Sequence, residues 1–302
     1  VVNWFSRMRG RAVGIMEMGL PLGTAIVAIL AQSIMSAGFN WRFVFLLLGI
    51  ASLIVILIPS LFIVRRSPAE MGLRMDGDPP PHDVAAKSEQ PESTTGTNPE
   101  VWTLRRALRT PTFWMVSLGL LLSGWTGGGI GFLLVPYFTD KGLTAGIAVA
   151  GVSAFALTGA LAAPMWGALS ERFSVKVLIS GATIIGAGLT ASGLLVNGPF
   201  GVLIFTSLFG FTIRGQNSLA VMLIVQHFGR HAFGAISGSI MQFLIVGLGI
   251  GPVAMTLIFD VSNSYLAVFT LGSVLLLGSA ILFWIAPTPT YSAKLGPPPN
   301  TA

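Results

Sequence analysis

One arginine lies near the middle of a long apolar segment. The segment Gly201–Val225 is long enough to cross a bilayer, because a membrane-spanning helix needs about 20 mostly apolar residues. A rise of about 1.5 Å per residue places Arg214 roughly 20 Å from one end and about 16 Å from the other. A cation at that depth costs at least about 2.5–3.5 kcal/mol and usually faces a bundle interior or a water-filled cavity. With Gln216 and Asn217 beside it, Arg214 predicts the wall of a polar cavity inside a membrane bundle.

Glu17 is the second charge expected inside the membrane, about 8 Å from the edge of its segment by helix rise. One interpretation is a proton-coupling acid, since ionisable groups inside membranes often mark proton relays. The other, which we favour, is a packing or gating partner of a base such as Arg7 or Arg11. A permanent pair between Glu17 and Arg214 also stays open, although we favour substrate contact for Arg214.

The composition is that of a polytopic membrane protein. Hydrophobic residues make up 53% of the 302 residues and charged residues only 9%, whereas soluble domains carry about 25% charged residues. The chain has no cysteine, which excludes disulfides, thiolate metal sites and thiol nucleophiles. The net charge of +6 resides in loops between apolar segments, so it indicates membrane topology and not nucleic-acid binding.

Apolar segments alternate with short connections along the chain. A polar stretch containing Pro79–Pro81 separates the first two segments from the rest and has the composition of a flexible linker. The expected membrane spans are Ala12–Ala37, Phe43–Val64, Phe113–Pro136, Thr144–Leu169, Val175–Val196, Phe200–Val225, Ala232–Phe259 and Tyr265–Ala286.

Lysines and arginines are distributed unevenly between alternate connections. If Val1–Arg11 is cytoplasmic, the opposite side holds only Arg42 and Lys141. Cytoplasmic loops of membrane proteins carry the excess of Lys and Arg, so both ends of the chain and the linker are predicted to be cytoplasmic.

The chain also repeats itself. Asn3–Phe45 begins NWFSRMRGRAVGI and ends GFNWRFVF, while Gln226–Phe269 begins QHFGRHAFGAISG and ends DVSNSYLAVF. Internal repeats of this kind mark transporter architectures. Four spans precede the second copy within its half and none precede the first. We therefore expect two six-helix halves, of which the first four helices are absent from this sequence.

A short turn carries a recognisable pattern. Gly167-Ala-Leu-Ser-Glu171-Arg172-Phe-Ser-Val-Lys176 resembles the loop motif of the major facilitator superfamily, with Glu171 where aspartate is usual and Ser174 where glycine is usual. The glycine allows close helix approach, and the acid and bases can pair across a cytoplasmic gate. Arg230, in a second basic connection, completes the predicted gate.

Three further stretches narrow the resemblance. WFSRMRGRAVG, RRSPAEMGLRMDGD and HFGRHAFGAISG look like the monocarboxylate porter and oxalate/formate antiporter branch of that superfamily. The resemblance implies helices five to twelve of a twelve-helix bundle. The expected organisation is a loop over 1–11, two helices over 12–64, a cytoplasmic linker over 65–111, six helices over 112–287 and a tail over 288–302.

The resemblance also implies which helices line the cavity, namely Phe113–Pro136 and Phe200–Val225, the family's helices seven and ten. On the first of these we expect Trp125 and Tyr137 to contribute, and the run GWTGGGIGF to allow bending or unwinding. Gln242 is a further candidate from the family's helix eleven. Packing and hydrogen bonding between helices are the alternative roles of these side chains.

Together these features predict an all-α, multi-pass secondary transporter that moves a small organic anion by alternating access. The expected partners are a mono- or dicarboxylate, with a proton or a second anion as the coupled species, and the lipid bilayer. We expect no cofactor, metal or nucleic acid, no enzymatic activity, and a plasma membrane location such as the bacterial inner membrane. The alternatives are a membrane sensor or scaffold without transport, and a truncated product.

Overall fold

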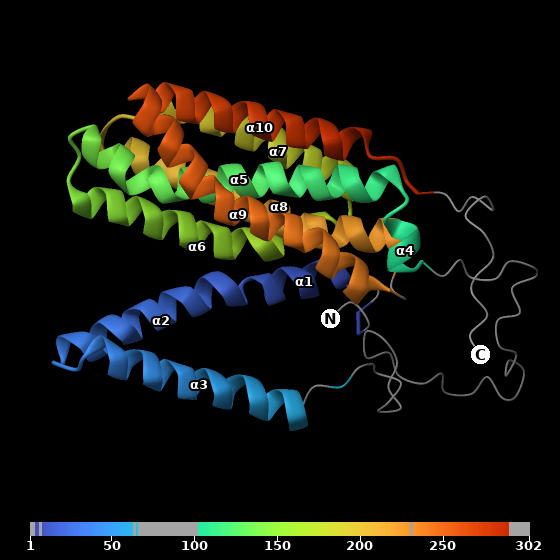
Figure 1. The fold of residues 1–302 in the computed structure, drawn as a ribbon, viewed down its shortest axis with the longest axis horizontal. Helices are drawn as coiled ribbons and strands as arrows, with labels where there is room; N and C mark the ends of the chain where they lie inside the picture. The colour runs from blue at the N-terminus through green and yellow to red at the C-terminus, as the bar shows by residue number, and fades with distance from the viewer. Residues whose placement is uncertain (1–3, 6–7, 63–64, 66–101, 230–231, 290–302) are drawn as a thin grey trace, which may run out of the picture.

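The computed structural model describes residues 4–5, 8–62, 65, 102–229 and 232–289. Throughout these residues the regular structure is helical (Figure 1), which confirms the predicted all-α, multi-pass bundle. Among them, seven helices are long and apolar enough to cross a membrane. These are α3 (Trp41–Phe62), α5 (Pro111–Asp140), α6 (Ala145–Leu169), α7 (Val175–Ser192) with η3 (Gly193–Leu195), α8 (Gly198–Phe228), α9 (Phe233–Ser262) and α10 (Tyr265–Ile285).

Local signals set where several of these helices begin and end. The Thr110 hydroxyl accepts a hydrogen bond from the N–H of Phe113, and Pro111 occupies the first turn of α5. Thr144 caps α6 in the same way. Helix α9 ends at Asn263, whose φ of 48° lies in the left-handed region that stops a helix. These caps place the chain reversals at the ends of the spans.

Helices α5–α10 form one packed unit, which we call the six-helix unit. Within it α5 packs chiefly against α9, α6 against α8, and α10 against α7 and α5. Helix α8 is the most enclosed of the seven, because 72% of an 18-residue apolar stretch of this helix is buried. The helix that carries Arg214 is therefore surrounded by the other helices.

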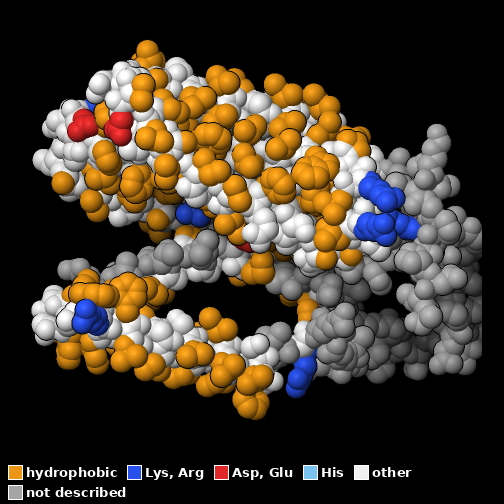
Figure 2. Space-filling view, viewed as in Figure 1, with side chains coloured by type: hydrophobic (Ala, Val, Ile, Leu, Met, Phe, Trp, Pro, Cys, Tyr) orange, Lys and Arg blue, Asp and Glu red, His pale blue; other side chains and the backbone are white. Residues whose placement is uncertain are grey.

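The first three helices of the chain, α1 to α3, lie on one side of this unit. Helix α1 (Arg9–Glu17) packs against α6, and α2 (Gly19–Ser36) diverges from it (Figure 1). Helix α3 contacts chiefly α2, and only 6% of its 18-residue apolar stretch is buried. Figure 2 shows open space between α3 and the six-helix unit, with apolar side chains covering the outer surface of both.

The first expected span, Ala12–Ala37, is not a continuous helix. It divides at Met18 into α1 and α2, and neither piece is among the seven candidate spans. Pro21 has no N–H to donate to the carbonyl of Glu17, so the regular hydrogen-bond ladder cannot continue there. At the junction, the N–H of Met18 is shared between the carbonyls of Gly14 and Ile15, at 3.2 Å each.

Candidate functional site

A cavity of about 320 Å³ lies between α5, α6, α8 and α9. Of the residues that line it, Arg214 alone is charged, and Asn217 lies one helical turn away on the same face of α8. The other lining residues are mainly glycines and apolar side chains: Ser123, Gly124, Gly127, Gly128, Gly131, Phe132, Leu134, Val152, Phe155, Ile213, Leu244, Leu248 and Pro252. The structure thus combines a single cation with a largely apolar wall.

Two residues of α6 position Arg214. A Cβ added to Gly159 would lie 2.5 Å from the Arg214 Cγ, so the arginine stem crosses α6 in the space left by this glycine. The guanidinium carbon lies 5.7 Å from the centroid of the Phe155 ring. That distance falls within the range of cation–π attraction, which partly offsets the cost of removing the cation from water.

The glycines of α5 serve close packing, and the helix is continuous over Pro111–Asp140. A Cβ on Gly124 would lie 2.6 Å from the Leu244 carbonyl oxygen, and one on Gly128 would lie 2.8 Å from that of Leu248. These positions let α5 and α9 approach backbone to backbone, and the helix does not unwind at them.

The polar run after Arg214 divides between two environments. Asn217 lines the cavity, whereas Gln216 is 1% exposed and faces the interior of the six-helix unit. There the Ser123 hydroxyl donates a hydrogen bond to Gln216 Oε1, and the Nε2 of Gln216 has no hydrogen-bond partner in the described part of the chain. Gln216 is thus placed to hold α5 against α8.

Three other predicted binding residues lie away from the cavity lining. Tyr137 is 1% exposed, packs on Phe269 and donates a hydrogen bond to the Gly193 carbonyl at 2.8 Å. Trp125 packs in the apolar core of the six-helix unit, and Gln242 is exposed on α9. Trp125 lies two positions before Gly127, which lines the cavity, and residues at that spacing face different sides of a helix. The type of a residue does not show which side it faces.

Glu17 is the last residue of α1 and is half-buried. Its carboxylate and the Arg214 guanidinium interact electrostatically. The two charges that were predicted inside the membrane are therefore carried by α1 and α8, which both pack against α6 and contact each other.

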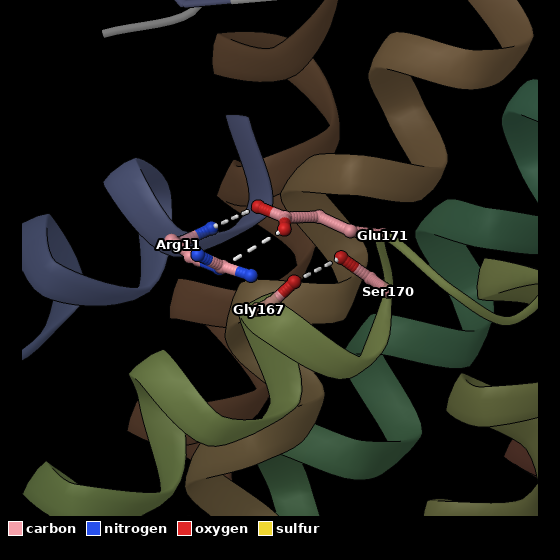
Figure 3. Close-up of polar contacts among 4 residues, drawn as sticks. All are labelled: Arg11, Gly167, Ser170 and Glu171. Carbon is pink, nitrogen blue, oxygen red and sulfur yellow. Dashed lines mark hydrogen bonds and ion pairs between the residues drawn. The ribbon is translucent and has the colours of Figure 1, made fainter. Parts of the chain in front are cut away.

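Just beyond the C-terminal end of α6, Glu171 joins the six-helix unit to α1 (Figure 3). One carboxylate oxygen lies 3.1 Å from Arg11 Nε, and the other accepts a hydrogen bond from the Arg11 backbone N–H at 3.0 Å. The first four N–H groups of a helix lack intrahelical partners and carry partial positive charge. Glu171 thus acts both as an ion-pair partner and as an N-terminal cap of α1.

Gly167 makes the closest contact between α1 and α6. A Cβ on Gly167 would lie 2.1 Å from the carbonyl oxygen of Gly10, and a Cβ on Gly10 would lie 2.0 Å from that of Gly167. The Ser170 hydroxyl donates to the Gly167 carbonyl at 2.6 Å beside the same contact (Figure 3). We call this contact between Gly10, Gly14, Ala163 and Gly167 the glycine seam.

The remaining predicted gate residues lie elsewhere. Lys176 Nζ donates to the Ala286 carbonyl at 2.9 Å and so joins the start of α7 to the end of α10. Arg172 is exposed, and Arg230 lies outside the described residues.

Sequence reasoning missed Phe155, Gly159 and Gly10 as parts of the site. A signal for two of them was present, because Gly159, Ala163 and Gly167 recur every four residues on α6, as do Gly10 and Gly14 on α1. Small residues at this spacing form a continuous face that admits a neighbouring helix. Phe155 carried no such signal, since its contact with the guanidinium depends on the crossing of α6 and α8.

The fold and the cavity define a multi-pass α-helical membrane protein with a solute-sized cavity between its helices. The chain belongs to the Major Facilitator Superfamily, whose family model matches residues 1–154 and 144–301. This superfamily consists of transporters, in agreement with the prediction that the chain is not an enzyme. The chain is also similar to MFS transporter asaE of Aspergillus flavus, at 24% identity. That match covers 92% of this chain and 58% of the relative, so the chain spans little more than half of the relative's length.

Proposed function

We propose that this chain is part of a secondary transporter that moves a small organic anion, and that Arg214 binds the anionic group. The observation that carries the proposal is the half-buried Arg214 guanidinium on the wall of an otherwise mainly apolar cavity. A guanidinium offers a planar fork of donors that matches a carboxylate. Asn217 lies beside it on the same wall and supplies further polar contacts, while the glycine and phenylalanine surface accommodates the apolar part of the solute.

The arrangement of the helices supports alternating access around this cavity. Helix α1 contacts α6 at the glycine seam and at Glu171, near the end of the molecule where α4 (Leu104–Ala107) lies, whereas α2 diverges from α6 toward the other end (Figure 1). The proposed gate at the first end is then closed and the opposite side open. Transport requires the seam to separate as the other end closes.

We further propose that the helices before α4 correspond to helices five and six of the superfamily fold, and α5–α10 to helices seven to twelve. The expected domain boundaries and the monocarboxylate porter branch belong to the same proposal, as does the plasma membrane location. Figure 2 shows Lys and Arg side chains gathered at the end where α4 lies, which supports a cytoplasmic position for that end.

Uptake of labelled carboxylates into proteoliposomes that contain the full-length protein tests the transport proposal. We expect saturable uptake of at least one mono- or dicarboxylate, blocked by excess unlabelled acid and not by a neutral sugar of similar size. Binding of carboxylates without any flux would favour the sensor or scaffold alternative and would contradict the proposal.

The proposed orientation of the chain in the membrane predicts which connections are accessible from outside. These 302 residues contain no cysteine, so once any cysteine elsewhere in the full-length protein is replaced, single introduced cysteines report sidedness. In right-side-out vesicles we expect a membrane-impermeant maleimide to label Asn197→Cys, in the α7–α8 connection, and to label Arg109→Cys only after permeabilisation. The reverse pattern would invert the proposed orientation.

Gly159 yields a prediction about the positioning of Arg214. Gly159→Ala places a Cβ 2.5 Å from the Arg214 Cγ, so the arginine stem must move and the guanidinium with it. Overpacking of this kind costs about 1–3 kcal/mol, and we expect carboxylate uptake at limiting substrate to fall by about tenfold. Gly146→Ala on the same helix is the matched control, because its added Cβ meets no atom within 4 Å. Equal uptake by both variants would remove the positioning role.

A further inference from the structure

We infer that Glu17 is the resident counter-ion of Arg214: its carboxylate pairs electrostatically with the guanidinium in this conformation, and an incoming anion displaces it. The inference deepens the proposed function, on which the identity of the incoming anion rests. The pair itself rests on the packing of α1, α6 and α8.

The direction of α1 along α6 brings Glu17 to the level of the cavity. Gly10 lies against Gly167, and Gly14 lies against Pro164, so the two helices run antiparallel. Each turn forward along α1 therefore moves about one turn back along α6. Glu17, nearly one turn beyond Gly14, reaches the turn of α6 that precedes Pro164.

That turn of α6 begins at Gly159, the residue over which the stem of Arg214 passes. Arg214 comes to it from α8 and Glu17 from α1, so the two side chains meet across the small-residue face of α6. Each is half-buried, and each contributes to the electrostatic environment of the other. Within the described residues, the guanidinium donates no hydrogen bond, and it lies over the Phe155 ring. Its donors therefore remain open to a carboxylate that can approach more closely than Glu17.

This arrangement couples occupancy of the cavity to the helix that forms the gate. An unpaired cation inside the membrane is costly, and Glu17 reduces that cost while the cavity is empty. A bound anion replaces this attraction, so α1 loses one of its ties to α8 and is held by the glycine seam and Glu171. A ligand shifts a conformational equilibrium only through such a difference in interactions between the two states.

Charge-selective labelling of a cysteine beside Arg214 tests the inference. Residue 217 lines the same cavity, and these 302 residues contain no other cysteine, so Asn217→Cys is labelled alone once any cysteine elsewhere in the full-length protein is replaced. The measured quantity is the ratio of its labelling rates with an anionic and a cationic methanethiosulfonate reagent. We expect Glu17→Gln to raise this ratio about tenfold, because it leaves the charge of Arg214 uncompensated, and Glu17→Asp to stay near the parent.

Asp260→Asn supplies the control, since it removes an equal charge from an exposed position near the far end of α9, where solvent and salt screen it. A Glu17→Gln ratio that changes no more than the Asp260→Asn ratio would overturn the inference. Glu17→Asp also separates the loss of charge from any folding defect, because it alters the side chain and keeps the carboxylate.

Protection by benzoate tests the displacement. We expect the concentration of benzoate that halves labelling by the anionic reagent to fall about tenfold in Glu17→Gln, because the anion no longer competes with an internal carboxylate. Equal protection of the parent and Glu17→Gln would overturn the displacement. If benzoate protects neither protein, carboxylate binding by this cavity fails, and the labelling ratio still decides whether Glu17 is the counter-ion.

Discussion

Arg214→Gln is expected to lower carboxylate uptake at limiting substrate by 100-fold or more. The substitution removes the one charge on the described cavity wall and its forked donors. Hydrogen bonds to charged groups contribute about 1.5–3 kcal/mol each, and a guanidinium can make two of them to one carboxylate. The loss therefore exceeds about two powers of ten, because about 1.4 kcal/mol corresponds to a tenfold change.

Arg214→Lys distinguishes charge from geometry. Lysine keeps the positive charge but loses the planar fork, so we expect uptake between that of the parent and that of Arg214→Gln. Initial rates over a range of substrate concentrations, with the amount of folded protein measured by size-exclusion chromatography, give the comparison. Uptake by Arg214→Gln at the parent rate would contradict the assigned role of this residue.

The second large effect is expected at the glycine seam. Gly10→Ala would place a Cβ 2.0 Å from the Gly167 carbonyl oxygen, and Gly167→Ala would place one 2.1 Å from that of Gly10. Both obstacles are backbone atoms, which cannot move aside as a flexible side chain could. Either substitution must therefore separate α1 from α6, and we expect a shift toward the conformation open at that end together with loss of most transport.

Labelling of a cysteine beneath the gate measures this opening. Met222, which is 6% exposed, lines a smaller cavity together with Gly10 and Glu171. We expect Gly167→Ala to accelerate labelling of Met222→Cys by at least tenfold from the side proposed to be cytoplasmic. Gly146→Ala, on the same helix with free space around its Cβ, should leave the rate unchanged. Similar rates in both variants would show that the seam does not close this end.

The Glu171–Arg11 pair should contribute less than the seam. The Arg11 side chain is 54% exposed, so water and salt screen the attraction. Half-exposed ion pairs contribute on the order of 1 kcal/mol or less. We therefore expect backbone contact at the seam to contribute more to closure of the proposed gate than the Glu171–Arg11 pair does.

Composition and apolar segment length were enough to predict the architecture. A segment of about 20 apolar residues has few alternatives to a membrane helix, because its backbone must satisfy its own hydrogen bonds in lipid. Seven of the expected segments became candidate spans. The division of Ala12–Ala37 at Met18 escaped the prediction, because hydropathy does not register the effect of Pro21 on the hydrogen-bond ladder.

The sequence by itself determined the residue that the cavity is built around, because an arginine in mid-membrane requires a polar or watery environment. It also determined the contact-forming glycine of the loop motif. Only the tertiary structure decided the neighbours of these residues. It placed Gln216 and Tyr137 in the core and Asn217 on the cavity wall, and it set the stem of Arg214 from α8 over Gly159 of α6. The physical reason is that helix rotation and crossing depend on backbone approach between distant segments, and residue type along one helix does not encode its partner's position.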